Sequence, residues 1–588
     1  MSRKLLLIIL IPAVLLIAGY FALQIYLRTG IKKEEKKLGQ SLGNMDTLTA
    51  KADTLGGKKT SPADLRPLFI QRLQLLLKKS SNGLYNLAVG DLKVDVLKST
   101  ISLHDVTVSP DAKEIAALKH AGLLPNDVFT ISFKDLLIEG VNLDDAITSK
   151  TMDYKLIKLV NPVIAIDHQK AKPEEKSRES FSQRFLKEME KLSIQKFVLD
   201  DGSIVVHDRD KGSTKKLANV QVLMNDILLD EKTRNDKDRF LFAREARIDF
   251  HDFNTRTKDG LYNFKIGGVS VNASKKQVTL KNLSFGSTLS KEAFVKKQKV
   301  AKEMYSLSLP TLTISGVDWW PAFNGEEVKA TTVQTNGGHM AVYFDRAMPP
   351  TNKMGNFPNQ LLMKLPINVD VDELKIRDLD VSYEERNPLS QQSGTVYLDN
   401  ASIDIANIRN EGKNRSPLTA SGTALLMHKV PIQARFQFDM NNYRSGVFSA
   451  SISSNTPFDG SLLNSFTMPL GMMKVEKGEL QKLQANIHGN ELNAGGDVLV
   501  LYKDLKLSLL EKDKDTAALN KKHVTSLLAN LIVLKNDNLK KGKAPRIGQA
   551  SFRRDPEGGF MMLVWKTILV GVLKTIGAPE KIAYKKGK

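Results

Sequence analysis

The sequence predicts a mainly β fold: an elongated, curved β-sheet groove, taco-like in section, with an N-terminal transmembrane helix and short flanking helices. Three observations predict it. An eight-residue phrase of alternating apolar residues recurs along most of the 588 residues, an uncharged apolar run stands near the start, and nothing in the middle resembles a linker. We therefore expect a transmembrane anchor (1–30), a juxtamembrane tether with a capping helix (31–83), a repeating β-groove domain (84–510), and C-terminal helices with a basic, amphipathic membrane-contact segment (511–588).

The repeated phrase is clearest at 374–381, where apolar residues stand at offsets 0, 2, 5 and 7. On a helix, at about 100° per residue, these offsets fall near about 0°, 200°, 140° and 340°, so no apolar face forms. On a strand each half alternates correctly, and the extra residue between the halves fits a β-bulge that keeps all four side chains on one surface. The other copies begin at Ile101, Ile131, Leu192, Val222, Phe264, Val278 and Leu312. An ordinary β-sandwich core with chance matches is the alternative.

If the phrases form one groove, their apolar residues line it. A strand in this reading has one apolar face and one polar face. The expected groove-lining residues are Val94, Val96, Ile101, Leu103, Phe133, Ile138, Ile194, Leu280, Ile376 and Val381.

The N-terminal run 5–27 holds 23 residues without a charge. At about 1.5 Å per residue it reaches roughly 34 Å, enough to cross a hydrocarbon core of about 30 Å. A cleaved signal peptide is the alternative, but the run is longer than a typical signal-peptide core and no small-residue cleavage site precedes the charges from Arg28. We expect an uncleaved anchor.

A few stretches predict helices and loops around the strands. Residues 62–79 carry one apolar stripe and predict a short capping helix. Within the β-region we expect short helices at 182–191 and 291–302, and surface loops at 168–180 and 230–239. Beyond it, 516–534 reads as a helix and 546–554 as a basic strand.

The C-terminal run 560–576 is strongly apolar but contains Lys566 and Lys574. At 17 residues it is short for a membrane span, so we expect an interfacial or partly inserted helix. The expected membrane contacts are Trp565, Lys566, Leu569, Leu573 and Lys574. A buried helix that caps the end of the β-domain is the alternative.

The charge pattern favours a membrane over nucleic acid as a partner. The formal net charge is +21, and from 535 to 588 thirteen Lys and Arg against four acids leave +9 around the C-terminal apolar run. A basic segment that surrounds an apolar run suits an anionic membrane surface better than a duplex. We expect no nucleic-acid partner.

The sequence carries no pattern typical of catalysis. It has no cysteine, and its nine histidines show no metal-ligand spacing. Nucleophile elbows, dinucleotide-binding glycine fingerprints and kinase signatures are missing. We therefore expect no enzyme activity, no catalytic or metal site and no cofactor. The carboxylates of a glycoside hydrolase can be far apart in sequence, so an anchored glycan hydrolase stays open, although nothing supports it.

Three passages, with the N-terminal run, resemble the AsmA-like family of bacterial envelope proteins, which includes TamB-type members. They are 89–108, 374–384, and 461–470 followed by 478–483. The likeness spans most of the chain, from Met1 to about residue 510. The family implies a single-pass inner-membrane anchor with the bulk of the chain in the periplasm. It also implies a groove of curved strands with an apolar concave face, similar to the bridge-like lipid transfer proteins of eukaryotes. The chain departs from the family in being shorter than its largest members and in ending in a basic amphipathic segment.

The resemblance implies that the groove shields lipid acyl chains and supports phospholipid transport and outer-membrane integrity. Phospholipids, the inner membrane, and the outer membrane or a protein in it are then the expected partners. A structural or adhesive β-rich envelope protein without lipid cargo is the alternative from another functional class.

Overall fold

The computed structural model describes residues 81–584 with gaps, together with several residues between 67 and 78. The longest gaps are 141–150, 170–189, 320–326, 514–517 and 522–534. The expected anchor at 5–27, the tether, nearly all of the expected helix at 182–191, and Val96 lie outside the described residues. Those described between 67 and 78 are helical, as expected for the capping helix.

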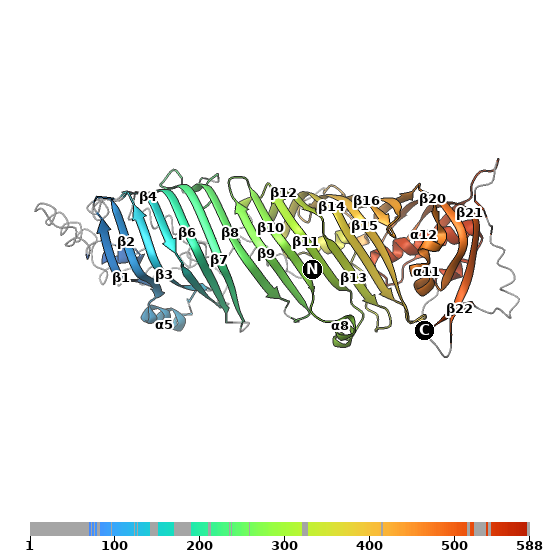
Figure 1. Ribbon diagram of the computed structural model, residues 1–588, viewed down its shortest axis with the longest axis horizontal. Coiled ribbons are helices and arrows are strands. Elements are labelled where there is room, and N and C mark those ends of the chain that lie inside the picture. Colours follow the sequence, from blue (N-terminus) through green and yellow to red (C-terminus); the bar gives the residue numbers. More distant parts are fainter. Residues whose placement is uncertain are drawn as a thin grey trace, which may run out of the picture. The chain divides into compact units, whose positions relative to one another are not determined.

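The described chain is mainly β, which confirms that part of the predicted fold class; the curved groove and the transmembrane helix stay predictions. Its 23 strands belong to one mixed sheet (Figure 1). The chain divides into two compact units. The N-terminal unit comprises the described residues up to Phe253 and Ile266–Thr279, and the C-terminal unit comprises Asn254–Lys265 and the described residues from Leu280 onward.

Besides the helical residues between 67 and 78, the N-terminal unit contains eight strands and one further helix among its described residues. They are β1 (Tyr85–Asp95), β2 (Thr100–Pro110), α5 (Ala112–His120), β3 (Asp127–Glu139), β4 (Thr151–Val160), β5 (Val163–His168), β6 (Lys191–Asp208), β7 (Ser213–Leu229) and most of β8 (Ala243–Arg256). Strands β9 (Tyr262–Asn272) and β10 (Gln277–Ser287) contribute residues to both units.

The C-terminal unit holds the remaining described elements. Its strands are β11 (Met304–Ser315), β12 (Glu327–Asn336), β13 (His339–Asp345), β14 (Asn368–Arg386), β15 (Ser393–Arg409), β16 (Leu418–Leu426), β17 (Val430–Phe438), β18 (Phe448–Ser454), β19 (Phe458–Asp459), β20 (Met473–Gly489), β21 (Asn493–Lys512), β22 (Leu519–Lys521) and β23 (Ile547–Arg553). Its helices are α8 (Lys291–Lys297), α10 (Pro358–Met363), α11 (Asn464–Gly471) and α12 (Phe560–Ile576), with 3-10 turns η1 (Tyr443–Ser445), η2 (Gly460–Leu463) and η3 (Glu580–Ile582).

The two units share a strand arrangement that the sequence analysis did not predict. In the N-terminal unit, β4 and β5 both pair antiparallel with β3 and parallel with β6. In the C-terminal unit, β12 and β13 both pair antiparallel with β11 and parallel with β14. A parallel pair requires a crossover connection. The crossover between β13 and β14, residues 346–367, includes α10.

The predicted bulge is present at five of the eight phrases as a residue with left-handed backbone. Each occupies the second of the two polar positions: Asp105 (φ 49°), Asp226 (φ 52°), Asn282 (φ 51°), Gly316 (φ 68°) and Asp378 (φ 52°). Asp, Asn and Gly tolerate this region best. The extra residue keeps the apolar neighbours on one face; Leu103 and Val106, on either side of Asp105, are 1% and 2% exposed. Outside the phrases, the same left-handed backbone conformation occurs at Asp201, Asn219, Asp252, Asn400, Asn407 and Asp504.

Five phenylalanine rings gather around the start of α12. The ring centroid of Phe560 lies 5.0 Å from that of Phe357 and 4.9 Å from that of Phe448, and Phe436 and Phe438 complete the group. The buried guanidinium of Arg554 lies 4.5 Å from the Phe357 ring centroid. It donates to the carbonyls of Lys353 at 2.7 Å and Gly558 at 2.9 Å, so it ties the segment before α12 to the crossover.

Several local predictions have clear outcomes. Helix α8, strand β23 and helix α12 confirm the expected elements at 291–302, 546–554 and 560–576, with α8 shorter than expected. The prediction of a helix from 516 is wrong at its start, because β22 pairs there with β21; the rest of that segment lies outside the described residues. Helices α5, α10 and α11 were not predicted, since each is too short for a clear helical period. Within the described ranges, no helix has the length and apolar character to span a membrane.

Candidate functional site

In the N-terminal unit, the strand register lines up predicted groove residues in rows that cross the sheet. Val94 pairs with Ile101, and Ile101 pairs with Ile138. Directly paired residues point to the same face, so these three share one face. The row continues without a polar residue through Ile157, Phe197, Met224 and Ala246.

A second apolar row runs beside the first. It consists of Leu92, Leu103, Leu136, Leu159, Leu199, Val222 and Ile248. Phe133 pairs with Val106, and Ile194 pairs with Ile227. Ile101, Leu103, Ile138 and Ile194 are buried, whereas Val94 and Phe133 are half-buried.

In the C-terminal unit, Ile376 stands in a row that crosses eight strands. Each member pairs directly with the next, in the order Ile376, Ile403, Gly422, Ala434, Ile452, Ala485, Val498 and Gly548. Val381 stands in another apolar row, with Leu307, Met340, Leu398, Leu426 and Val430. Leu280, on β10, is fully buried.

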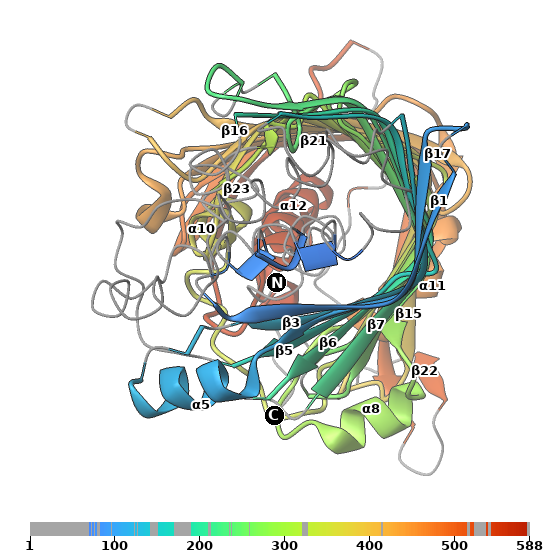
Figure 2. The same ribbon diagram turned by 90° about the vertical axis from the view of Figure 1, so that its left-hand side faces the viewer.

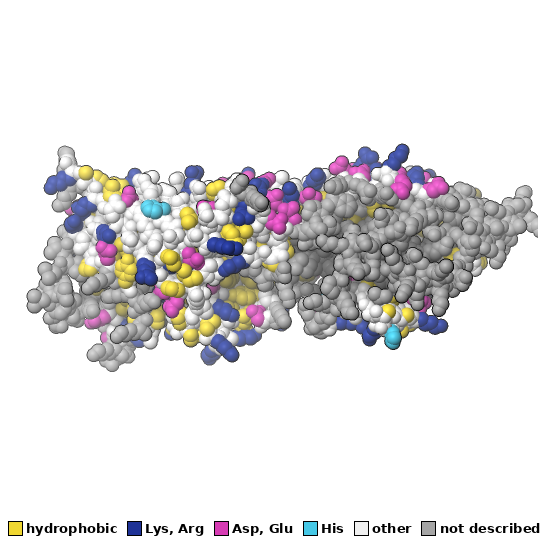
Figure 3. All heavy atoms as spheres, turned by 180° about the vertical axis from the view of Figure 1, so that it is seen from behind, with side chains coloured by type: hydrophobic (Ala, Val, Ile, Leu, Met, Phe, Trp, Pro, Cys, Tyr) yellow, Lys and Arg dark blue, Asp and Glu magenta, His cyan; other side chains and the backbone are white. Residues whose placement is uncertain are grey.

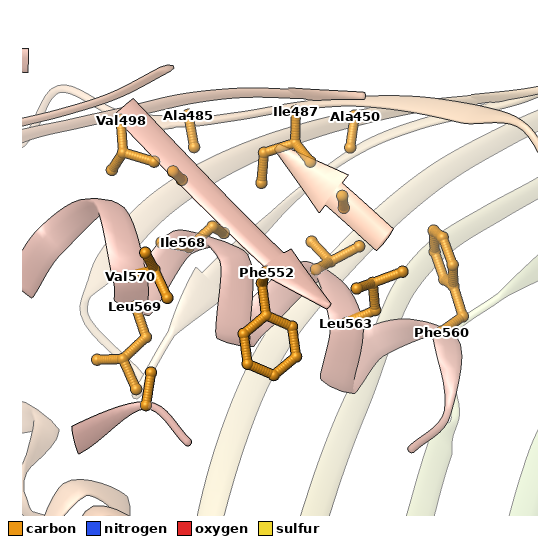
Figure 4. Close-up of a cluster of buried hydrophobic side chains, with 14 of the residues drawn as sticks. Ala450, Ala485, Ile487, Val498, Phe552, Phe560, Leu563, Ile568, Leu569 and Val570 are labelled. Carbon is orange, nitrogen blue, oxygen red and sulfur yellow. The ribbon is translucent and has the colours of Figure 1, made fainter. Parts of the chain in front are cut away.

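Helix α12 packs on β21 and β23, the strands that carry one end of the Ile376 row (Figures 2 and 4). Figure 4 shows side chains of Ala485, Val498 and Phe552 near those of α12, and all three are at most 6% exposed. The approach is close: a Cβ at Gly548 would lie 2.0 Å from the carbonyl oxygen of Gly571, and one at Gly571 would lie 2.4 Å from Val498 Cγ2. Glycine is therefore required at both positions. We call the surface on which α12 packs the α12 face.

The α12 face is covered unequally along the Ile376 row. Ala485 and Val498, under the helix, are 0% exposed. Ile376, Ile403 and Ile452, in the same row on β14, β15 and β18, are only half-buried, and so are Val381 and Leu398 in the next row. Figure 3 shows hydrophobic side chains at the surface of the C-terminal unit, among charged side chains of both signs. The described part of the unit thus has a closed apolar core under α12 and a partly accessible apolar surface over β14 and β15.

The structure contradicts two of the five predicted membrane contacts on α12, Leu569 and Leu573. Leu569 and Leu573 are 9% and 1% exposed and belong to the core cluster, so they face the sheet and are not available to a membrane. Trp565 is 43% exposed, with its ring 5.7 Å from that of Phe466. Lys574 pairs with Glu580 at 3.3 Å. This packing matches the alternative, a buried helix at the end of the β-domain.

A charged group of side chains stands where β14 continues past Val381. Tyr383 and Glu385 point to the same face as Val381, because alternate strand residues share a face. The Tyr383 hydroxyl donates to the Glu385 carboxylate at 2.7 Å, and Arg346 donates to its other oxygen at 3.1 Å. Burial raises the pKa of Tyr383, and the charge of Glu385 raises it further.

A second ion pair and one lysine complete the group. Lys353 pairs with Glu303, and its ammonium lies 4.1 Å from the centroid of Phe344, which pairs with Glu385 in the β13–β14 register. Lys566 comes from α12, which other contacts hold beside this group. The guanidinium of Arg554, just before α12, donates to the Lys353 carbonyl, and Trp565 packs on Phe466 of α11, a helix that accepts a hydrogen bond from Asn387 just after β14. Burial lowers the pKa of Lys566, the positive charge of Arg346 lowers it further, and the charge of Glu385 acts in the opposite direction. We call Glu303, Arg346, Lys353, Glu385 and Lys566 the charged cluster.

Sequence reasoning missed the charged cluster because its members are spread over more than 260 positions of the chain, from 303 to 566. No local pattern brings them together. The one available signal was Lys566, a charge within a strongly apolar run.

In the part of the chain that the structure describes, no group of three or more His, Asp or Glu could hold a metal ion.

Comparisons with known proteins do not assign the chain to a family. No protein-family model matches it, and no curated protein is similar to it.

Proposed function

We propose that this chain binds lipid acyl chains on apolar rows of its sheet and so supports phospholipid transport and outer-membrane integrity in a bacterial envelope. The Ile376 row carries the proposal. It is closed under α12 but half-buried over β14 and β15, with no polar side chain from Ile376 to Gly548; on β12 it meets the buried Thr335. Accessible apolar surface in rows marks a site for an apolar ligand, because burying it is favourable. Shielding acyl chains requires no catalytic group.

The remaining parts of the proposal rest on the sequence. The uncharged run at 5–27 supports a single-pass inner-membrane anchor with the bulk of the chain in the periplasm. The resemblance to AsmA-like proteins supports a curved groove, phospholipid cargo, and contact with the outer membrane or a protein in it. The alternative is a structural or adhesive envelope protein whose apolar rows bind no lipid.

The first test is lipid analysis of the purified full-length protein. Mass spectrometry of extracted lipids should find about one or more phospholipid molecules per chain after extensive washing in detergent. A protein that carries no lipid, and takes up none from vesicles, would favour the structural alternative.

A pair of adjacent variants then locates the binding surface. Val381→Asp places a charge on the half-buried apolar row, whereas Ser382→Asp places the same charge on the opposite face of β14. We expect Val381→Asp to lower bound lipid several-fold while both variants keep the wild-type circular dichroism spectrum, because a charge in contact with acyl chains is costly. Equal lipid loss in both variants, or none in either, contradicts the assignment of the surface.

A further inference from the structure

The charged cluster contains more positive than negative charge. Arg346, Lys353 and Lys566 contribute three positive charges, and Glu303 and Glu385 contribute two negative ones, which leaves a formal +1. Both carboxylates are already engaged. Glu385 accepts from Arg346 and Tyr383, and Glu303 is paired with Lys353.

Lys566 is the one cation of the charged cluster that neither carboxylate of the cluster pairs with. Among the residues that the structure describes, it makes no salt bridge, although it is half-buried on α12. Placing an ammonium group in such a position is unfavourable unless a counter-charge is bound. Burial accordingly lowers the pKa of Lys566, and the neighbouring guanidinium of Arg346 adds to the effect. The site is therefore poised to gain from an anion.

The position of the cluster relative to the apolar rows restricts the kind of anion. On β14, Ile376, Val381 and Glu385 follow one another along the strand, and the bulge at Asp378 keeps the two apolar residues on one face. Glu385 lies nine positions after Ile376, at most about 30 Å away at about 3.3 Å per residue. An apolar surface thus ends in a site with excess positive charge, an arrangement that complements an anionic amphiphile.

We propose that the charged cluster binds the anionic, phosphate-bearing headgroup of a lipid whose acyl chains lie on the Ile376 and Val381 rows, with Lys566 as the cation that pairs with the headgroup. This inference rests on the proposed lipid-binding function and adds a headgroup preference to it. Arg346 and Lys353 are the ion-pair partners of Glu385 and Glu303, so both carboxylates are already engaged and the charge of Lys566 is the one offered to the ligand.

The test compares lipids that differ only in headgroup. Full-length protein, stripped of lipid, is offered phosphatidylglycerol or diacylglycerol with the same acyl chains, and bound lipid is quantified by native mass spectrometry. We expect wild-type protein to prefer phosphatidylglycerol by about tenfold, the contribution typical of one charge-assisted hydrogen bond. Lys566→Met should bind both lipids equally, and Lys566→Arg should restore the preference.

Lys574→Met is the matched control, because Lys574 lies on the same helix but is paired with Glu580. It should keep the wild-type preference. Inorganic phosphate is offered separately, and it should bind far more weakly than phosphatidylglycerol because it lacks acyl chains.

The outcomes separate the two proposals. If neither lipid binds wild-type protein, the lipid-binding function itself fails. If both lipids bind equally well to wild-type protein, or if Lys566→Met keeps the preference, the lipid-binding function stands and the headgroup site is overturned. If inorganic phosphate binds as tightly as phosphatidylglycerol, the cluster takes a free anion and the headgroup assignment is also overturned.

Discussion

At the scale of single residues, aspartate and asparagine with left-handed backbone decide how this sheet presents its apolar side chains. Asp378 lies between Ile376 and Leu379, at a shift of register between β14 and β15. Without the extra residue, side chains beyond it would alternate to the opposite face. In the five phrases that contain such a residue, the polar pair thus sets the backbone conformation as well as facing solvent.

Replacing Asp378 tests this role. Asp378→Ala should lower the free energy of unfolding by about 1 kcal/mol, because alanine disfavours the left-handed region that aspartate tolerates. Asp378→Gly should cost little or nothing, since glycine adopts this conformation freely. Urea denaturation of the three proteins measures the difference. Equal destabilisation by Ala and Gly would mean that the carboxylate, not the backbone, matters.

Lys566 makes stability depend on pH in a predictable direction. Its pKa in the folded protein is lowered, mainly by burial, so the unfolded chain binds more protons at alkaline pH and stability rises with pH toward the ordinary lysine value of about 10.4. Arg346 and Glu385 are the charges that act on it. Lys566→Met should therefore stabilise lipid-free protein at neutral pH, and the gain should shrink as pH approaches 10.

Denaturation of the wild type and Lys566→Met at pH 7 and pH 10 checks this expectation. Lys574→Met serves as the comparison, because Lys574 has an ion-pair partner. A gain for Lys566→Met that is the same at both pH values would show that the side chain acts through packing and not through its charge.

At the scale of elements, the position of α12 determines which part of the sheet surface beneath it, the α12 face, is a closed core. The alternation along β23 is complete: Gly548, Ala550 and Phe552 are buried, and the residues between them are exposed. Glycine at 548 and 571 lets helix and strand backbones approach closely. At the other end of the helix, the ring of Phe560 packs among four other phenylalanine rings.

Gly548→Ala tests this close approach. The new Cβ would meet a backbone oxygen that has no rotamer to escape into, so we expect a loss of about 1–3 kcal/mol in the free energy of unfolding. Gln549→Ala, an exposed neighbour on the same strand, should change it by less than about 0.5 kcal/mol. Similar, small effects of both changes would mean that α12 moves away from β23 at little cost.

At the scale of the whole molecule, both units have the same strand arrangement. Two successive short strands each pair in parallel with one long strand, β6 in the N-terminal unit and β14 in the C-terminal unit. In the C-terminal unit, the crossover that this arrangement requires carries Arg346 and Lys353 to the α12 face. The charged cluster is therefore a consequence of the topology.

Bound lipid should protect one part of the C-terminal unit selectively. Hydrogen exchange followed by mass spectrometry should slow in β14 and β15 when phosphatidylglycerol is added, because their apolar rows are half-buried without it. Exchange in β21 and β23 should be unchanged, since α12 already covers them. Uniform slowing throughout the unit would point to general stabilisation rather than to binding on these rows.

The sequence by itself determined the strand phrases, the bulge at their centre and the bounds of the C-terminal helix. These features are local: alternation, a residue that tolerates left-handed backbone, and an apolar run between glycines each act within a few positions. Only the tertiary structure decided where the apolar helix is buried. A helix apolar on most sides gains as much against a sheet as in a membrane surface, so Leu569 and Leu573 carry no sign of which it is. The charged cluster also depended on the tertiary structure, because only the crossover and the packing of α12 bring Arg346, Glu385 and Lys566 together.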